Sequence, residues 1–255
     1  ANDRLVFVKD VSEQDKLERM RRDFVGNVSH ELRTPLTVIK GYIETLQSLA
    51  DQSDTTLRKS LGSIDTQVSR MERLISDLLW LSRIESVEGE RKDDEIDMVA
   101  LLSDVQEGLL AAWPNREIRL NVSADQRILG SAIELRSAID NLLVNALKYS
   151  EGPVTLSWAE TVVGPALAVE DTGPGIESKH IPRLTERFYR VDKSRSQATG
   201  GTGLGLAIVK HVAVSHEAKL FVDSEVGKGS CFRLVFPNDR VSMPSDGAQA
   251  PSMTT

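Results

Sequence analysis

The first third of this chain contains apolar residues that recur at steps of three and four, and this pattern restricts the possible fold more than any other feature. One series runs over 17–46 and a second over 57–84. Residues at these steps share one face of an α-helix, so the sequence predicts two long helices. The polar break at 51–54 lies between them. It predicts the loop of an antiparallel helical hairpin.

The apolar stripe on these predicted helices is wider than one partner helix can cover. Positions 74–75 and 78–79, for example, are doubly apolar. In a four-helix bundle each helix packs against two neighbours, and two hairpins from two chains make such a bundle. We therefore expect a homodimer.

Beyond residue 85 the pattern changes to a mixture of helical and strand-like segments. Helices are predicted over 98–112, 131–149 and 204–215, and strands near 117–122, 153–160, 165–171, 218–224 and 230–236. The order of these segments predicts an α/β sandwich, with helices on one face of a mixed sheet.

Composition excludes some classes of protein. The net charge of −7 gives no reason to expect nucleic acid as a direct partner. No run of about 18 apolar residues is present, so we expect no membrane span in this sequence. A single cysteine rules out an intramolecular disulfide.

His30 lies inside the first predicted helix but outside its apolar stripe, which includes Val28 and Leu32. Thr34 is four residues from His30 and three from Glu31, and such residues are neighbours on a helix. A neutral imidazole nitrogen is a nucleophile near pH 7, and a carboxylate can accept the proton of its second nitrogen. On this segment alone, a solvated surface histidine is an equal alternative.

A later predicted helix carries polar residues on one face. Asn141, Asn145 and Lys148 share that face. Amide oxygens suit Mg²⁺, and a lysine suits phosphate. Taken alone, a solvated helix face explains these residues equally well.

Asp171 directly follows a strand-like run and is followed by Gly173 and Gly175. Its carboxylate could accept a hydrogen bond from an exocyclic amine, and the glycines would let a ring approach the backbone. An ordinary Asp-Thr-Gly turn is the alternative.

Two further segments suit a polyphosphate. The stretch 179–195 is locally basic in an acidic chain, and a glycine loop over 200–205 opens a predicted helix. Backbone N–H groups at such a helix start bind phosphate oxygens. The loop lacks the Gly-Lys-Ser/Thr of a P-loop and the strand-linked spacing of a dinucleotide fingerprint.

In order and spacing, five segments resemble the motif boxes of the sensor histidine kinases of two-component systems. The resemblance covers about residues 16–237. The H, N, G1, F and G2 boxes correspond to 29–36, 141–150, 171–175, 186–190 and 201–206.

This resemblance implies a helical hairpin that forms a dimeric four-helix bundle, followed by an α/β sandwich ATP-binding domain of the gyrase, heat-shock chaperone and histidine kinase type. ATP and Mg²⁺ would be the cofactors. His30 would accept the phosphoryl group and Glu31 its displaced proton. Thr34 would orient water during dephosphorylation of the partner, and Arg190 would contact the γ-phosphate region.

The resemblance also implies which residues bind the nucleotide. Asn145 would hold Mg²⁺ and Asp171 the adenine amine. The full set comprises Asn141, Asn145, Lys148, Tyr149, Asp171, Gly173, Gly175, Ile176, Gly201, Thr202, Gly203, Leu204, Gly205 and Leu206.

The expected activity is autophosphorylation of His30 by ATP, followed by phosphoryl transfer to an aspartate in the receiver domain of a response regulator. Phosphatase activity toward that regulator is also expected. Segments 26–42 and 180–193 are similar to the phosphate-regulon subfamily, which implies control of phosphate acquisition. In such a kinase the fragment is cytoplasmic, and only upstream segments attach it to the bacterial inner membrane.

The expected domain boundaries follow from these patterns. Residues 1–15 would be the tail of an upstream PAS-like sensor domain, and 16–86 the dimerisation and histidine phosphotransfer domain. A linker would span 87–95, the ATP-binding domain 96–238, and a disordered Ser/Pro/Gly/Thr-rich tail 239–255.

Two other classes of function are consistent with parts of the sequence. A degenerate kinase could act only as a dimeric docking module, but His30, Asn145 and Asp171 are all in place. A gyrase-like ATPase that drives conformational change would lack the histidine-bearing hairpin. The hairpin therefore favours the kinase.

Overall fold

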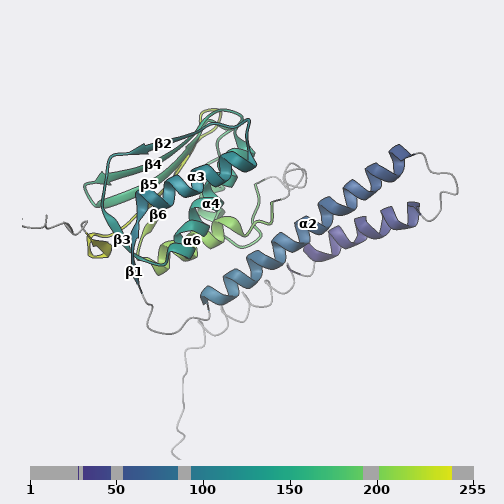
Figure 1. Cartoon of the computed structure of the whole chain (residues 1–255), viewed down its shortest axis with the longest axis horizontal. Helices are drawn as coiled ribbons and strands as arrows, with labels where there is room; N and C mark the ends of the chain where they lie inside the picture. Colours follow the sequence, from purple (N-terminus) through teal and green to yellow (C-terminus); the bar gives the residue numbers. More distant parts are fainter. Residues whose placement is uncertain (1–27, 29–30, 47–53, 86–92, 192–200, 243–255) are drawn as a thin grey trace, which may run out of the picture. The chain divides into compact units, whose positions relative to one another are not determined.

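The computed structural model describes residues 28, 31–46, 54–85, 93–191 and 201–242. The chain divides into two compact units, 1–76 and 77–255, and each unit is described by itself (Figure 1). The expected upstream segment, 1–15, lies outside the described residues.

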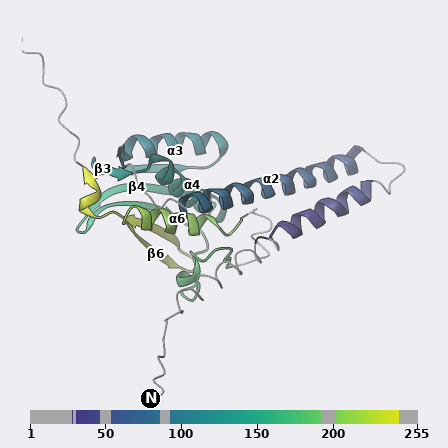
Figure 2. The same ribbon diagram turned by 90° about the horizontal axis from the view of Figure 1, so that it is seen from below.

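The first unit is a helical hairpin. A helix over 31–46 lies beside the first part of α2 (Asp54–Glu85) and runs antiparallel to it (Figures 1 and 2). The two predicted helices are thus confirmed within the described residues. Pro35 and Leu74 are buried, the latter with 1% of its surface exposed. Among the described residues, no helix has both the length and the apolarity that crossing a membrane requires.

The second unit is built on a five-stranded sheet in the order β2-β4-β5-β7-β6. Its strands are β2 (Ile118–Val122), β4 (Val154–Thr161), β5 (Gly164–Asp171), β6 (Lys219–Glu225) and β7 (Gly229–Val235). The β2–β4 pair is parallel and the other pairs are antiparallel. The predicted mixed sheet is therefore confirmed.

Three helices cover one face of this sheet: α3 (Met98–Ala112), α4 (Ala132–Tyr149) and α6 (Gly205–Ser215) (Figure 1). On β4, alternate residues are buried because successive side chains of a strand point to opposite faces. Trp158 of β4 packs edge-on against Phe236, with ring centroids 5.9 Å apart. The predicted α/β sandwich is confirmed.

A second, three-stranded sheet was not predicted. It has the order β1-β3-β8, from β1 (Asp94–Asp97), β3 (Arg127–Gly130) and β8 (Val241–Ser242). Asp94 and Glu95, predicted as linker, therefore open a strand. Residues 239–242, predicted to begin a disordered tail, instead belong to η2 (Asn238–Arg240) and β8. Strands this short carry no readable alternation, and they form because β3 pairs with both of them.

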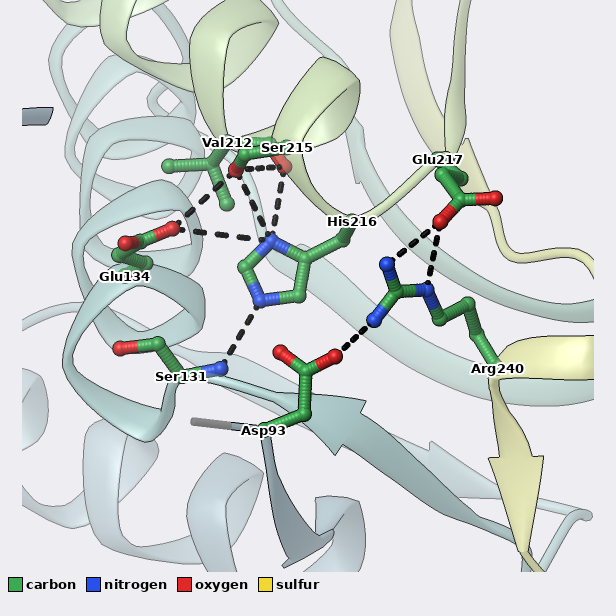
Figure 3. A network of polar contacts seen from close by, with 8 residues as sticks. All are labelled: Asp93, Ser131, Glu134, Val212, Ser215, His216, Glu217 and Arg240. Atoms are coloured by element: carbon green, nitrogen blue, oxygen red, sulfur yellow. Dashed lines mark hydrogen bonds and ion pairs between the residues drawn. The ribbon is translucent and has the colours of Figure 1, made fainter. Parts of the chain in front are cut away.

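An ion-pair network ties the start of this small sheet to the end of α6 (Figure 3). The Arg240 guanidinium pairs with Asp93, immediately before β1, and its Nε donates to Glu217 Oε1 at 2.9 Å. Glu217 has a φ of 57°, a conformation that glycine adopts more easily. The ion pair with Arg240 gives the Glu217 side chain a structural role that a glycine at this position could not fill.

His216, the residue before Glu217, is buried and joins α6 to the start of α4 (Figure 3). Its Nε2 accepts the backbone N–H of Ser131 at 3.1 Å, so in the neutral ring Nδ1 carries the proton and donates to the Val212 carbonyl at 2.9 Å. A Cβ on Gly130 would lie 2.3 Å from the imidazole ring. His216 therefore joins the two helices, and its ring fits there because residue 130 is a glycine.

Candidate functional site

The Asp171 carboxylate marks the centre of the candidate site. Asp171 is the last residue of β5, and only 8% of its surface is exposed. It accepts hydrogen bonds from the backbone N–H of Gly173, at 2.7 Å, and from that of Ser230. Burial raises the pKa of this carboxyl, the two hydrogen bonds oppose the rise, and nearby Glu170 adds to it.

The turn after Asp171 is packed too closely for side chains. A Cβ on Gly173 would lie 2.7 Å from the Tyr149 carbonyl oxygen at the end of α4. Gly175 has a φ of +71°, and a Cβ there would lie 2.1 Å from the Glu225 carbonyl oxygen. Glycine is therefore required at both positions by the packing of the protein itself. The carboxylate of Asp171, next to this turn, is the group that could accept a hydrogen bond from an amine.

The β6–β7 hairpin holds this turn from one side. Ser224 Oγ accepts the backbone N–H of Ile176 at 2.8 Å and donates to the Gly229 carbonyl at 2.9 Å. The Gly227 N–H donates to the Pro174 carbonyl at 2.8 Å. Sequence reasoning missed Ser224, because its partner Ile176 lies 48 residues away and no local pattern links the two.

The polar face predicted for residues 141–148 lies on α4. Asn141, Asn145 and Lys148 are half-buried, and Tyr149 is 46% exposed. Asn141 Nδ2 donates to the Ser137 carbonyl at 2.8 Å. The helix thus presents amides, an ammonium group and a phenol at its carboxyl-terminal half.

The glycine loop comes to this same helix. A Cβ on Gly205, the first residue of α6, would lie 2.5 Å from Asn141 Oδ1, and one on Gly201 would lie 3.8 Å from the Tyr149 hydroxyl. Gly203 has a φ of +73° and accepts the Phe188 N–H at 2.8 Å. The structure therefore brings together the N, F and G2 boxes.

The remaining residues of the loop anchor it. Thr202 and Leu204 are buried, and Leu206 is half-buried and packs on the core. Because these side chains are wholly or partly buried, they fix the glycine loop to the rest of the α/β unit. Contact with a nucleotide stays a prediction for Thr202, Leu204 and Leu206.

The basic segment contributes Arg190, which is half-buried. The preceding Tyr189 is held by His180, whose Nδ1 lies 2.6 Å from the tyrosine hydroxyl. The Arg183 guanidinium stacks 4.3 Å from the centre of the Tyr189 ring. These contacts order the chain just before Arg190.

The helix over 31–46, which follows the predicted phosphoacceptor His30 in the sequence, belongs to the other compact unit. His30 itself lies outside the described residues. Glu31 is half-buried and pairs with Arg70 of α2, Nη2 to Oε2, at 3.0 Å, and the Arg70 side chain is only 9% exposed. Thr34 is exposed. Arg70 was missed, because one charged residue in a helical stretch carries no distinguishing signal.

The α/β unit has groups whose chemistry fits a magnesium nucleotide. Asp171 provides an acceptor, and α4 provides an amide and a lysine. Mg²⁺ usually keeps several waters and binds through one or two carboxylates and substrate phosphates. The amide oxygen of Asn145 would here be the protein ligand, with phosphates and waters as the other ligands.

Two domain families match the chain. Residues 20–87 match the His Kinase A (phospho-acceptor) domain. Residues 130–240 match the histidine kinase-, DNA gyrase B- and HSP90-like ATPase domain. The first match spans the hairpin and the second contains α4, the Asp171 turn and the glycine loop.

Two curated proteins and a solved structure are similar to most of this chain. The chain is 46% identical over 244 residues to the phosphate regulon sensor protein PhoR of Pseudomonas aeruginosa, covering 93% of this chain and 55% of PhoR. It is 39% identical over 237 residues to the sensor-like histidine kinase SenX3 of Mycolicibacterium smegmatis, covering 91% of this chain and 62% of SenX3. The crystal structure of full-length ShkA with AMPPNP has a TM-score of 0.60 and 28% identity, covering 84% of this chain and 45% of that one. The chain thus spans a little over half the length of the curated relatives.

The raised pKa of Asp171 predicts a pH-dependent stability. A carboxyl whose pKa is raised by folding contributes stability that is fully present below the ordinary value of 3.8 and is lost as pH rises through the folded value. The unfolding free energy of the wild type relative to Asp171→Asn should therefore fall as pH rises above about 4. Urea unfolding of both proteins at a series of pH values measures this difference.

Asp125→Asn, at an exposed aspartate, controls for the loss of one negative charge. A difference between wild type and Asp171→Asn that stays constant with pH would contradict the burial effect.

Proposed function

Because this chain belongs to the histidine kinases, with a phosphoacceptor domain followed by an ATPase domain, we propose that it phosphorylates His30 with ATP and passes the phosphoryl group to a response regulator. The receiving group is an aspartate of the receiver domain. The observation that carries this proposal is the buried Asp171 carboxylate beside a bare glycine turn, in the same unit as the polar face of α4.

Nucleotide binding divides among three groups of residues. Asp171 accepts a hydrogen bond from the adenine amine, and Gly173 donates its N–H to the same carboxylate. Lys148 and Arg190 contribute positive charge toward the phosphates. Asn145 would hold Mg²⁺ from the protein side, and the ion would supply charge neutralisation at the phosphates.

At the phosphoacceptor, a His30 ring nitrogen attacks the γ-phosphorus, the bond to the β–γ bridging oxygen breaks, and ADP leaves. The proton of the second ring nitrogen passes to Glu31. The ion pair with Arg70 restrains the position of the Glu31 carboxylate, and Glu31 is next to His30 in the sequence. Positioning and charge stabilisation provide most of the catalysis in phosphoryl transfer.

Dimerisation through the hairpin is part of the proposal. Large apolar side chains of the first unit remain exposed in the single chain, including Leu36 at 58%, Leu61 at 53%, Ile75 at 45% and Ile43 at 43%. A second hairpin would cover them in a four-helix bundle. Thr34, which is exposed, is the residue to which we assign a role in regulator dephosphorylation.

The proposed output is control of phosphate acquisition. Two curated PhoR proteins support it, that of Pseudomonas aeruginosa at 46% identity and that of Haemophilus influenzae at 38%. Each is called a phosphate regulon sensor protein. The upstream sensor domain and the inner-membrane attachment remain expectations about sequence outside this chain.

His30→Gln should abolish phosphorylation, because glutamine has no nucleophilic ring nitrogen. Incubation with γ-labelled ATP should place acid-labile label on the wild type only. His211→Gln, at a half-buried histidine of α6, serves as the matched control and should keep the label. Label that survives in His30→Gln would disprove the assignment of the phosphoacceptor.

Asn145→Ala should remove the effect of magnesium on nucleotide binding. AMPPNP should bind the wild type at least about tenfold more tightly with Mg²⁺ than with EDTA, and the variant should lose that difference while staying folded. Asn121→Ala, at an exposed asparagine of β2, should behave as the wild type. An unchanged magnesium effect in Asn145→Ala would remove this residue from the metal site.

Thr34→Ala should lose phosphatase activity and keep autophosphorylation, because the hydroxyl would orient water but takes no part in attack on ATP. The substrate is the regulator, chosen from a panel, that accepts the phosphoryl group fastest. Thr37→Ala is the control, since the Thr37 hydroxyl donates to the Arg33 carbonyl of its own helix. Equal decay of phosphorylated regulator with Thr34→Ala and wild type would refute the role.

A further inference from the structure

Arg116 lies in the segment between α3 and β2, and its side chain binds the main chain at the end of α4. Its Nη1 donates to the Leu147 carbonyl at 2.8 Å, and its Nη2 donates to the Ser150 carbonyl and, at 3.3 Å, to that of Gly152. Arg116 is half-buried, and these three acceptors are all backbone oxygens. Its guanidinium is therefore engaged with one short stretch of main chain.

That stretch is the carboxyl end of a helix, where the last four carbonyls have no partner within the helix. Leu147 is in this last turn, because α4 ends at Tyr149. A cation placed here also interacts favourably with the helix dipole. Helix ends fray unless they are tied down, so Arg116 acts as a C-terminal cap supplied by another segment.

The residues between the two main acceptors are functional candidates. Lys148 and Tyr149 lie between the carbonyls of Leu147 and Ser150, and both are expected to face the nucleotide. Because Arg116 fixes the main chain on either side of Lys148 and Tyr149, it restrains the positions of their Cα and Cβ atoms. Fraying of this turn would move both, without any change in the rest of α4.

The stretch of main chain that Arg116 binds also contacts the turn after Asp171. Ser150 is 2% exposed, and its Oγ lies 3.3 Å from Thr172 Oγ1. A Cβ on Gly173 would lie only 2.7 Å from the Tyr149 carbonyl oxygen, so the two segments are closely packed. Displacement of the helix end would therefore be transmitted directly to the turn that carries the adenine acceptor.

We propose that Arg116 is a positioning residue of the nucleotide site, which sets the last turn of α4 and, through Ser150, the turn after Asp171. This inference rests on the proposed function. Lysine cannot replace Arg116 fully, because a single ammonium group lacks the planar fork that reaches separate carbonyls. Arg116 touches neither substrate nor metal and acts through the main chain.

The test measures AMPPNP affinity in the presence of Mg²⁺, and KM and kcat for autophosphorylation, in Arg116→Ala and Arg116→Lys. Arg116→Ala should weaken binding by about tenfold and raise KM with little change in kcat, because charged hydrogen bonds of this kind are lost. Arg116→Lys should fall between it and the wild type. Millimolar methylguanidinium should restore affinity to Arg116→Ala alone.

Arg119→Ala is the matched control, since Arg119 is nearby on β2, 58% exposed in its side chain, and paired only locally with Glu117. Its affinity should equal that of the wild type. Amide exchange at 148–152 should be faster in Arg116→Ala than in Arg119→Ala.

Wild-type affinity in Arg116→Ala, even with a lowered melting temperature, would overturn the inference and leave the proposed function intact. If Arg116→Ala does not fold, wild-type affinity in Arg116→Lys overturns it equally. Absence of AMPPNP binding to the wild type would instead overturn the proposed function.

Discussion

The Asp171 carboxylate is buried at the end of β5, and a buried charge is tolerated only when hydrogen bonds replace the water that it loses. One donor, the Gly173 N–H, comes from the turn that follows. The other, the Ser230 N–H, comes from β7, which pairs with β5 so that Asp171 is opposite Ser230. The register of this strand pair therefore determines whether the acceptor can exist.

The turn beyond Asp171 is supported from two sides. Ser224 holds Ile176 from the β6–β7 hairpin, and Arg116 holds the end of α4 on the other side. Both supports act on backbone groups, so the turn keeps its shape without large side chains of its own. The turn is packed closely against the carbonyl oxygens of Tyr149 and Glu225, which explains why glycines are required there.

Most of the long elements could be predicted from the sequence, whereas short elements and contacts between residues far apart in the sequence could not. Helix α3 occupies the predicted residues 98–112, because a sustained helical period marks its bounds. The strands β1, β3 and β8 are two to four residues long and exist through their pairing. The candidate residues of the boxes were readable from order and spacing. The partners Arg70 and Arg116 were not, since they contact groups 39 and 31 or more residues away.

By itself the sequence determined that a helical hairpin precedes an α/β unit, and that a histidine, an amide-bearing helix, an Asp-Gly turn and a glycine loop occur in that order. Periodicity and motif spacing are local properties, so they survive in the bare sequence. Only the tertiary structure decided that Glu31 is paired with Arg70, that Ser230 completes the Asp171 site, and that Arg116 holds the end of α4. Each of these depends on strand register or helix packing, which bring together residues that no local pattern relates.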